Sequence, residues 1–371
     1  MSVKTAPGVE RPPLADEDRL YDRLAELSSA PRPLASLATA LRRGRLSASL
    51  MLFGPRGAGK RHAAIRLAQL LDCSAPGPKP SDGPCGGCAS CRRTLRGLDT
   101  NVRILEPEED GRGRRRTEIT VGQVRALQDS LAFKHEGSRR FLLIDPADRL
   151  SLVAQEALLK TIEEPPDGLT VVLSCERPAA MKPTMRSRCQ AVACPLPEVA
   201  ALTTLLEEQG LTTDQARKAA QLSGRDLHRA LTFDAEDEAD RWLDLARRLY
   251  EMLGRRGEGK ARDLALELLP PKGRTGADAA EHLEEILGRL ELILRDVMVE
   301  GALHREGLPV EGAGFSHPDG ESARKALAGR LAPGRAARLL DEVATARADL
   351  ALHVNTKTVL TDLLLKIHRS A

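Results

Sequence analysis

The sequence predicts an α/β domain with a parallel β-sheet, followed by regions made only of helices. Patterns of buried strands alternate with patterns of amphipathic helices as far as Pro195, which is typical of three layers with helices on both faces of a sheet. From Glu236 to Ala371, apolar residues recur at helical spacing and no strand pattern interrupts them. Aromatic residues make up 2% of the chain against 42% hydrophobic residues, so Ala, Leu and Val must build the core, which favours helical packing.

Charge and hydropathy exclude several classes of protein. The 56 Lys and Arg residues against 53 Asp and Glu residues leave a net charge of +3, which is too near balance to indicate nucleic-acid binding from charge alone. No stretch is long and apolar enough to span a membrane, and the N-terminus lacks the pattern of a signal peptide, so we expect a cytoplasmic protein. Residues 1–16 carry three prolines and little apolar content, and we expect a disordered tail there.

A strand, a glycine-rich turn and a helix follow in residues 50–71. Leu50 to Phe53 are apolar, the turn reads GPRGAGK, and apolar residues then recur at helical spacing. The backbone N–H groups of such a turn and the N-terminus of the helix attract phosphate, and the lysine can reach the terminal phosphates of a nucleotide. A glycine-rich turn without a ligand is the alternative. The predicted nucleotide-binding residues of this loop are Gly54, Gly57, Gly59 and Lys60.

Two positions depart from what ATP hydrolysis needs. The residue after the lysine, where a Ser or Thr hydroxyl would hold the magnesium ion, is Arg61. A buried strand from Arg140 ends in Asp145, where a nucleotide-bound magnesium ion would be held through water, so Asp145 also belongs to the predicted nucleotide site. A hydrolytic ATPase of this type would follow that aspartate with a glutamate, but here Pro146 follows and cannot accept a proton. The predicted site is therefore degenerate, and we expect ATP binding to be weak or absent.

Four cysteines lie close together directly after this helix. They follow the pattern C-x11-C-x2-C-x2-C, and the segment GPCGGCASC around them has too little apolar bulk to bury free thiols. Thiolates at C-x2-C spacing suit tetrahedral zinc, and an iron–sulfur cluster is the alternative for four thiolates. With four protein ligands the site would be closed, so the metal is expected to fold the segment and not to catalyse a reaction. The predicted zinc ligands, in a module at 73–91, are Cys73, Cys85, Cys88 and Cys91.

The remaining elements of the first domain have local signals of their own. Thr120 is a candidate N-cap for the helix that follows it. Glu108 to Arg116 forms a charged loop, for which a solvated turn is favoured over a phosphate contact. The other predicted elements are a strand at 102–105, a helix at 121–133, a helix at 152–162 stopped by two prolines, and a strand at 169–174.

The order of these motifs resembles one family. The glycine-rich loop, the four-cysteine insertion after the first helix, the segment ALLKTIEEPP at 157–166 and Ser187-Arg188-Cys189 follow one another as in the delta-prime subunits of bacterial clamp loaders. These are AAA+ proteins related to the gamma/tau subunits of DNA polymerase III. The resemblance covers about residues 18–236 and continues only in helical character. It implies an AAA+ P-loop domain at 17–195, a small helical lid domain at 196–235 and a helical collar domain at 236–371 for oligomerisation.

The resemblance also implies a role for one arginine. In the family the arginine of the Ser-Arg-Cys motif projects into the nucleotide site of a neighbouring subunit, so Arg188 is our candidate for a trans-acting arginine finger. An exposed arginine in an ordinary surface ion pair is the alternative. In the second domain, Arg225 precedes an aspartate as the γ-phosphate-sensing arginine of ATPase relatives does, which keeps an active ATPase open as an interpretation.

The expected function is that of a clamp-loader subunit in DNA replication. The resemblance implies a hetero-oligomer with gamma/tau ATPase subunits and a delta subunit, which meets the sliding clamp and primer–template DNA through the complex. Because the metal ligand and the general base are both missing, we expect this subunit to hydrolyse little or no ATP itself. An active gamma/tau-like ATPase is the runner-up interpretation. An unrelated zinc-containing P-loop kinase or transferase would need a substrate pocket and a catalytic base, and the sequence indicates neither.

Overall fold

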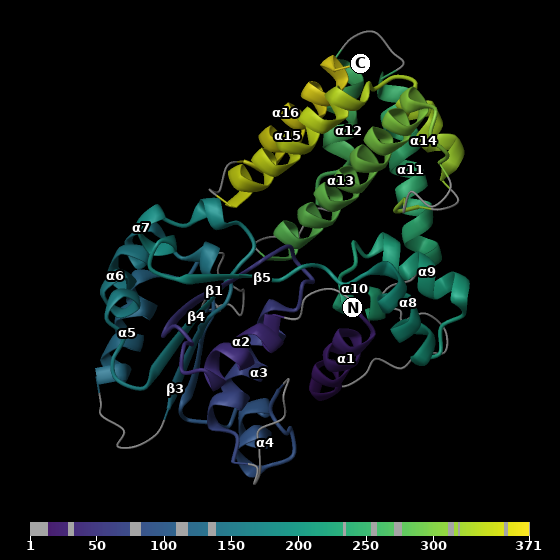
Figure 1. Ribbon diagram of the computed structural model, residues 1–371. Coiled ribbons are helices and arrows are strands. Elements are labelled where there is room, and N and C mark those ends of the chain that lie inside the picture. The colour runs from purple at the N-terminus through teal and green to yellow at the C-terminus, as the bar shows by residue number, and fades with distance from the viewer. Residues whose placement is uncertain are drawn as a thin grey trace. The chain divides into compact units, whose positions relative to one another are not determined.

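The computed structural model forms two compact units (Figure 1). One, here called the sheet unit, takes in the described residues up to 205 together with 225–228. The other, the helical unit, takes in 206–224 and the described residues from 229 onward. The structure describes residues 14–28, 33–74, 83–108, 118–132, 139–232, 235–253, 258–270, 277–310, 315–317, 320–351 and 355–370. Residues 1–13 of the predicted tail and 109–116 of the predicted charged loop lie outside these ranges.

Five parallel strands form the sheet in the order β2-β3-β4-β1-β5. They are β1 (Ser49–Phe53), β2 (Val102–Leu105), β3 (Arg140–Ile144), β4 (Leu169–Cys175) and β5 (Gln190–Ala193). The parallel sheet and its first four strands confirm the prediction. The sequence does not predict β5, because this edge strand has only four residues, three of them exposed, and so lacks an apolar run.

The sheet unit also contains seven helices in the described part of the chain. They are α1 (Leu14–Leu27), α2 (Pro33–Arg42), α3 (Lys60–Asp72), α4 (Ala89–Leu95), α5 (Val121–Ala132), α6 (Leu152–Glu163) and α7 (Pro183–Arg186), with short 3-10 turns at Ala147–Arg149 and Pro178–Ala180. Helix α1 begins at Leu14, inside the predicted tail and directly after a Pro-Pro pair, which a helix tolerates only at its start. The predicted cap of α5 is confirmed, because the Gln123 backbone N–H donates to Thr120 Oγ1 at 3.4 Å.

Helices pack on both faces of the sheet. On one face, Leu50 and Leu52 of β1 pack with α2 and α3 around Leu67. On the other face, Met51 of β1 packs with α5 and α6 around Val124. Alternate residues of β1 therefore face opposite layers, as the pleat of a strand requires. This arrangement is the predicted three-layer α/β fold, and it brings the carboxyl ends of the strands to one edge.

The helical unit is built around one long helix. Its helices are α9 (Thr213–Leu222), α11 (Ala235–Leu253), α12 (Gly259–Glu267), α13 (Ala277–Glu306), α14 (Glu321–Ala328), α15 (Pro333–Ala351) and α16 (Thr356–Arg369), while α8 (Val199–Glu208) and α10 (Leu227–Thr232) are divided between the two units. Helices α13 and α15 lie side by side (Figure 1). Their apolar faces form a core that includes Leu287 and Leu290 of α13. Trp242 of α11, which is 1% exposed, packs into the same core. No strand follows β5 in the described residues, as the helical spacing predicts.

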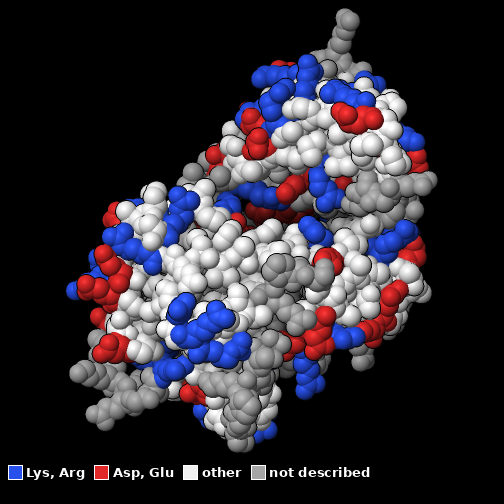
Figure 2. All heavy atoms as spheres, viewed as in Figure 1, with Lys and Arg blue, Asp and Glu red and all other residues white. Residues whose placement is uncertain are grey.

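The surface carries charges of both signs. On the face drawn in Figure 2, groups of Lys and Arg side chains and groups of Asp and Glu side chains are both present, separated by uncharged areas. This mixture agrees with the net charge of +3. Within the described ranges, none of the helices has an apolar run of the length that crossing a bilayer would take.

Candidate functional site

The predicted phosphate loop joins β1 to α3, and its glycines are required by its backbone. Gly57 and Gly59 have φ angles of 80° and 68°, in the left-handed region that side chains with a Cβ atom rarely adopt. A Cβ atom on Gly54 would lie 2.0 Å from the carbonyl oxygen of Cys194, so the loop passes directly against the backbone that follows β5. The loop conformation therefore depends on the three glycines that the sequence singled out.

Lys60 turns back onto the loop that precedes it. Its side chain is only 7% exposed, and its Nζ donates to the carbonyl oxygens of Gly54 at 2.9 Å and Pro55 at 2.7 Å. Nζ also lies 4.0 Å from Oε1 of Glu176, which follows β4. The ammonium group is thus held by groups of the chain itself.

Arg61 meets the carboxylate that the sequence placed at the magnesium position. Its guanidinium Nη1 donates to Asp145 Oδ2 at 2.8 Å and also to Glu106 Oε1. Glu106 follows β2 and Asp145 follows β3, and these strands are paired neighbours in the sheet. Burial lowers the pKa of Arg61, but the hydrogen bond to Asp145 and the charges of Glu106 and Asp145 outweigh it and raise this pKa above its ordinary value. Pro146 follows Asp145 and offers no side-chain acceptor.

Asp226 packs against the phosphate loop. It directly follows Arg225, the residue that the sequence analysis compares with a γ-phosphate-sensing arginine. A Cβ atom on Gly57 would lie 2.6 Å from the Asp226 Cα and Cβ atoms. Arg56 Nε lies 3.6 Å from Asp226 Oδ2, and the Asp226 side chain is 8% exposed. Arg225 directly precedes it with a left-handed φ of 65°. The segment around Arg225 therefore lies beside the phosphate loop, and its Asp226 is in close contact with Gly57.

Arg188 lies apart from the phosphate loop residues, after the short helix α7. Its Nε lies 3.1 Å from Glu163 Oε2, and its Nη1 donates to the Thr184 carbonyl at 2.9 Å. The side chains of Arg188 and Glu163 are 35% and 53% exposed. Arg188 is thus a surface residue with a partner from the end of α6.

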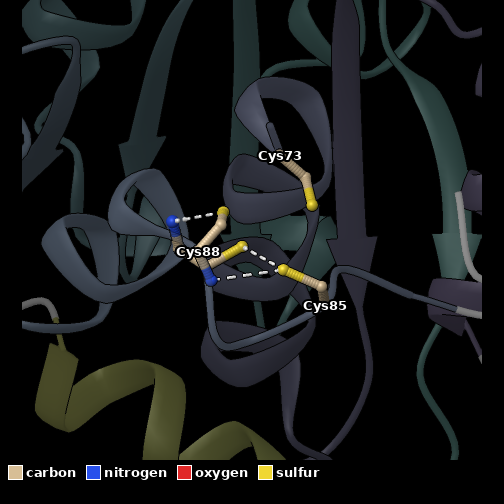
Figure 3. A group of neighbouring side chains, drawn as sticks. Cys73, Cys85 and Cys88 are labelled. Atoms are coloured by element: carbon tan, nitrogen blue, oxygen red, sulfur yellow. Dashed lines mark hydrogen bonds between the residues drawn. The ribbon is translucent and has the colours of Figure 1, made fainter. Parts of the chain in front are cut away.

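The four predicted metal ligands converge at one point. Their sulfur atoms all lie within 4.8 Å of one another, and Cys85 Sγ lies 3.9 Å from Cys91 Sγ. Figure 3 shows Cys73, at the end of α3, turned toward Cys85 and Cys88. Tetrahedral coordination with metal–sulfur bonds of about 2.3 Å requires sulfur atoms about 3.8 Å apart, so the donor set fits a four-thiolate metal centre.

Backbone N–H groups orient the thiolates of this centre. The N–H of Cys88 donates to Cys85 Sγ at 3.3 Å, and the N–H of Cys91 donates to Cys88 Sγ at 3.4 Å. The second hydrogen bond lowers the pKa of Cys88 from 9.0 to about 5, whereas burial raises that of Cys91. The buried Gln69 of α3 donates to the Cys91 carbonyl at 2.7 Å and so joins the module to α3.

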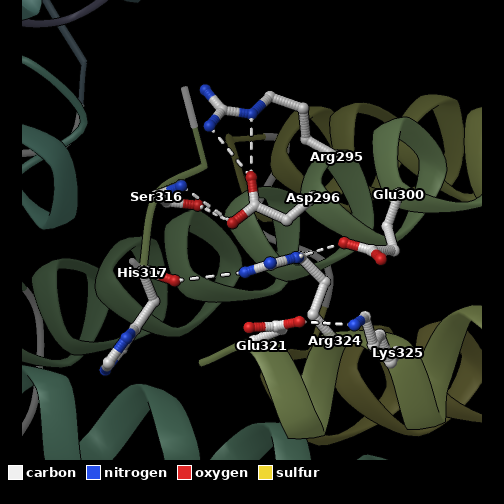
Figure 4. Close-up of polar contacts among 8 residues, drawn as sticks. All are labelled: Arg295, Asp296, Glu300, Ser316, His317, Glu321, Arg324 and Lys325. Carbon is white, nitrogen blue, oxygen red and sulfur yellow. Dashed lines mark hydrogen bonds and ion pairs between the residues drawn. The ribbon is translucent and has the colours of Figure 1, made fainter. Parts of the chain in front are cut away.

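A second polar cluster lies in the helical unit, where part of the segment 312–320 meets α13 and α14 (Figure 4). Arg324 Nε donates to Glu300 Oε2 at 2.7 Å, and both side chains are 4% exposed. The Arg324 guanidinium also lies 3.6 Å from the centre of the Phe315 ring. Asp296 accepts a 2.8 Å hydrogen bond from the Ser316 backbone N–H. These contacts fasten the described part of the segment to α13.

Sequence reasoning missed the carboxylates that hold the predicted site residues. Glu106 and Glu163 are the partners of Arg61 and Arg188. One signal was available for Glu106, because it follows the predicted strand at 102–105 and the carboxyl ends of parallel strands converge at one edge. Glu163 had no such signal, since its contact depends on how α6 and α7 end.

Comparison with known proteins finds relatives of this chain. The model for the family described as DNA polymerase III, delta subunit, matches residues 30–197. The chain is 37% identical over 152 residues to DNA polymerase III subunit delta' of Pseudomonas aeruginosa, which covers 41% of this chain and 44% of that relative. It is 29% identical over 271 residues to the Bacillus subtilis subunit delta', which covers 72% of this chain and 77% of the relative. It is 31% identical over 197 residues to DNA polymerase III subunit gamma/tau of Mycobacterium tuberculosis, which covers 52% of this chain and 32% of that relative.

These matches show that the chain is similar to subunits of bacterial DNA polymerase III. Residues 30–197 match the family model, and the resemblance to delta' subunits that the sequence motifs indicate is confirmed. The chain spans less than half of the length of the Pseudomonas relative and about three quarters of the Bacillus relative.

Proposed function

We propose that the chain is a clamp-loader subunit of DNA polymerase III that helps to load the sliding clamp onto primed DNA and hydrolyses little or no ATP itself. The observation that carries the proposal is the state of the nucleotide site. Arg61 and Pro146 stand where a magnesium ligand and a general base are needed, and the Arg61 guanidinium is already bonded to Asp145. An ATPase that lacks both groups loses the positioning of the phosphates and the activation of water.

Arg188 is the working residue of this proposal. A guanidinium that reaches the nucleotide site of a neighbouring ATPase subunit offsets the charge that develops on the transferring phosphoryl group, an effect of about 10³ to 10⁵ in rate in other systems. Support comes from its exposed position and from its partner Glu163, an ion pair of a kind that contributes only about 0 to 1 kcal/mol and can open readily.

The remaining parts of the chain are assigned to assembly. Residues 17–195 would be the AAA+ domain, 196–235 a helical lid and 236–371 a collar that joins the subunits into a ring. The partners would be gamma/tau ATPase subunits and a delta subunit in the cytoplasm, with the sliding clamp and primer–template DNA met through the complex. The net charge of +3 favours DNA contact within the assembly over a basic surface of this chain alone.

The four cysteines would bind one structural zinc ion. Four ligands close the coordination sphere, so the metal would stabilise the segment between α3 and α4 and take no part in catalysis. Zinc is favoured over an iron–sulfur cluster because the four sulfur atoms lie within 4.8 Å of one another, close enough to bind a single metal ion.

An active gamma/tau-like ATPase is the second candidate. The observation that favours it is Arg225, whose segment contacts the phosphate loop through Asp226. ATP hydrolysis by the purified chain, compared with a complex reconstituted from gamma/tau and delta subunits, tests the two candidates. We expect the isolated chain to show no turnover above background while the complex hydrolyses ATP. Robust turnover by the isolated chain would establish the second candidate.

A further inference from the structure

The residues around Asp145 do not fit a magnesium ion. Magnesium requires oxygen ligands in near-octahedral geometry, whereas arginine offers only N–H donors and a permanent positive charge. In this chain the guanidinium of Arg61 lies between Glu106 and Asp145, 2.8 Å from Asp145 Oδ2. It therefore occupies the side of Asp145 on which a hydroxyl and a metal ion would be needed.

Each of three carboxylates along this edge of the sheet already has a cationic side chain of the chain within 4.0 Å. Glu106, Asp145 and Glu176 follow β2, β3 and β4, which are neighbours in the sheet. Facing them, Arg61 bonds to the first two carboxylates and Lys60 lies 4.0 Å from the third. A divalent cation at Asp145 would lie against the guanidinium, and repulsion between like charges would oppose its binding.

We propose that the Arg61 side chain is the resident cation of this site, so that the phosphate loop holds no divalent metal. Arginine keeps its charge at every physiological pH, so it offsets one of the two negative charges of Glu106 and Asp145 and stays bonded to both carboxylates whether or not a nucleotide is present. Arg61 therefore does two things: it removes the hydroxyl that would bind a magnesium ion, and it puts its own positive charge where that ion would lie. The inference rests on the proposed function only in treating residues 54–60 as a phosphate loop.

Replacing Arg61 tests the proposal through metal binding, so it can fail while the ATPase proposal stands. The full-length zinc-loaded chain is titrated with Mn²⁺, and the free-ion signal is followed by electron paramagnetic resonance. We expect Arg61→Thr to gain one Mn²⁺ site at least tenfold tighter than any Mn²⁺ binding by the unsubstituted chain. The double variant R61T/D145N should lose it again.

Two further variants keep the test sharp. R56T removes a positive charge from the same loop but leaves Glu106 and Asp145 paired, so it should gain no Mn²⁺ site. R61Q keeps a long polar side chain without the charge and is titrated in parallel, so that the outcome does not depend on the folding of R61T. The proposal is overturned if the unsubstituted chain binds Mn²⁺ in a manner that D145N abolishes, or if neither folded Arg61 variant gains a site.

Discussion

Arg188 Nε lies 3.1 Å from Glu163 Oε2, and a second guanidinium nitrogen donates to the other carboxylate oxygen at 3.3 Å. The two residues are far apart in sequence and meet because α6 ends beside the short helix that precedes Arg188. Both side chains are partly exposed, so the pair contributes little to stability and can open readily. The isolated chain thus holds its candidate arginine finger at the surface through a partner of its own.

The four-cysteine centre predicts the metal content of the purified protein. We expect about one zinc ion per chain, because four converging thiolates complete a tetrahedral sphere. Substituting Cys85→Ser should lower the zinc content to near zero and make the remaining cysteines of the cluster reactive toward alkylating reagents. Cys189→Ser, which changes a thiol outside the cluster, serves as the control and should retain zinc. Metal analysis that finds no zinc, with all four thiols freely reactive in the unsubstituted protein, would rule the site out.

Cys175 predicts a loss of stability in alkaline solution. Burial, together with the charge of Asp148, raises the pKa of this thiol from 9.0 to about 12. Above pH 9 the unfolded chain releases a proton that the folded chain retains, so the free energy of unfolding should fall as the pH rises from 9 toward 12. The expected loss is about 1.4 kcal/mol per pH unit from this group alone.

The variant Cys175→Ala isolates that contribution. Its free energy of unfolding at pH 7 provides the baseline, since the lost sulfur has a packing cost of its own. Between pH 9 and pH 10.5 the unsubstituted protein should lose about 2 kcal/mol more than the variant, measured by urea unfolding. Curves that stay parallel over this range would show that Cys175 ionises equally in both states.

The buried ion pair between Arg324 and Glu300 predicts that removing one partner lowers the free energy of unfolding strongly, and that removing both partners restores most of it. Arg324→Leu leaves Glu300 charged and buried without its partner, and we expect the free energy of unfolding to fall by about 3 to 5 kcal/mol. The double variant R324L/E300L should recover most of this loss, because no unpaired charge remains. Trp242 is the only tryptophan of the chain and belongs to this core, so its fluorescence reports the unfolding of the helical unit. A double variant as unstable as the single one would contradict the explanation.

Local patterns account for the parts of the fold that the sequence predicts. The strand before the phosphate loop, the loop itself and the helix after it are contiguous, and each has a signal of its own in apolar spacing or glycine content. The four cysteines are similar, because C-x2-C spacing restricts where the thiolates can meet. Thr120 also acts locally, three residues before the N–H group that it accepts from.

Contacts between distant segments account for what the sequence does not predict. Glu106 contacts Arg61 only because β2 lies next to β3 in the sheet. The pattern of apolar residues in a strand does not indicate which strand will be its neighbour. Asp226 meets Gly57 across more than half of the sheet unit's sequence. Each of these partners changes the surroundings of a predicted site residue. The site residues could therefore be predicted from the sequence, whereas the groups that contact them became known only from the structure.

ATP hydrolysis by the reconstituted complex with Arg188→Ala tests the central claim most directly. Arg186→Ala, two residues earlier on the same segment, is the matched control, and gel filtration checks that both complexes assemble. We predict that R188A leaves assembly intact and slows hydrolysis at the neighbouring site by at least about tenfold, as for other arginine fingers, while R186A leaves the rate unchanged. An unchanged rate of hydrolysis in an intact R188A complex would contradict the account.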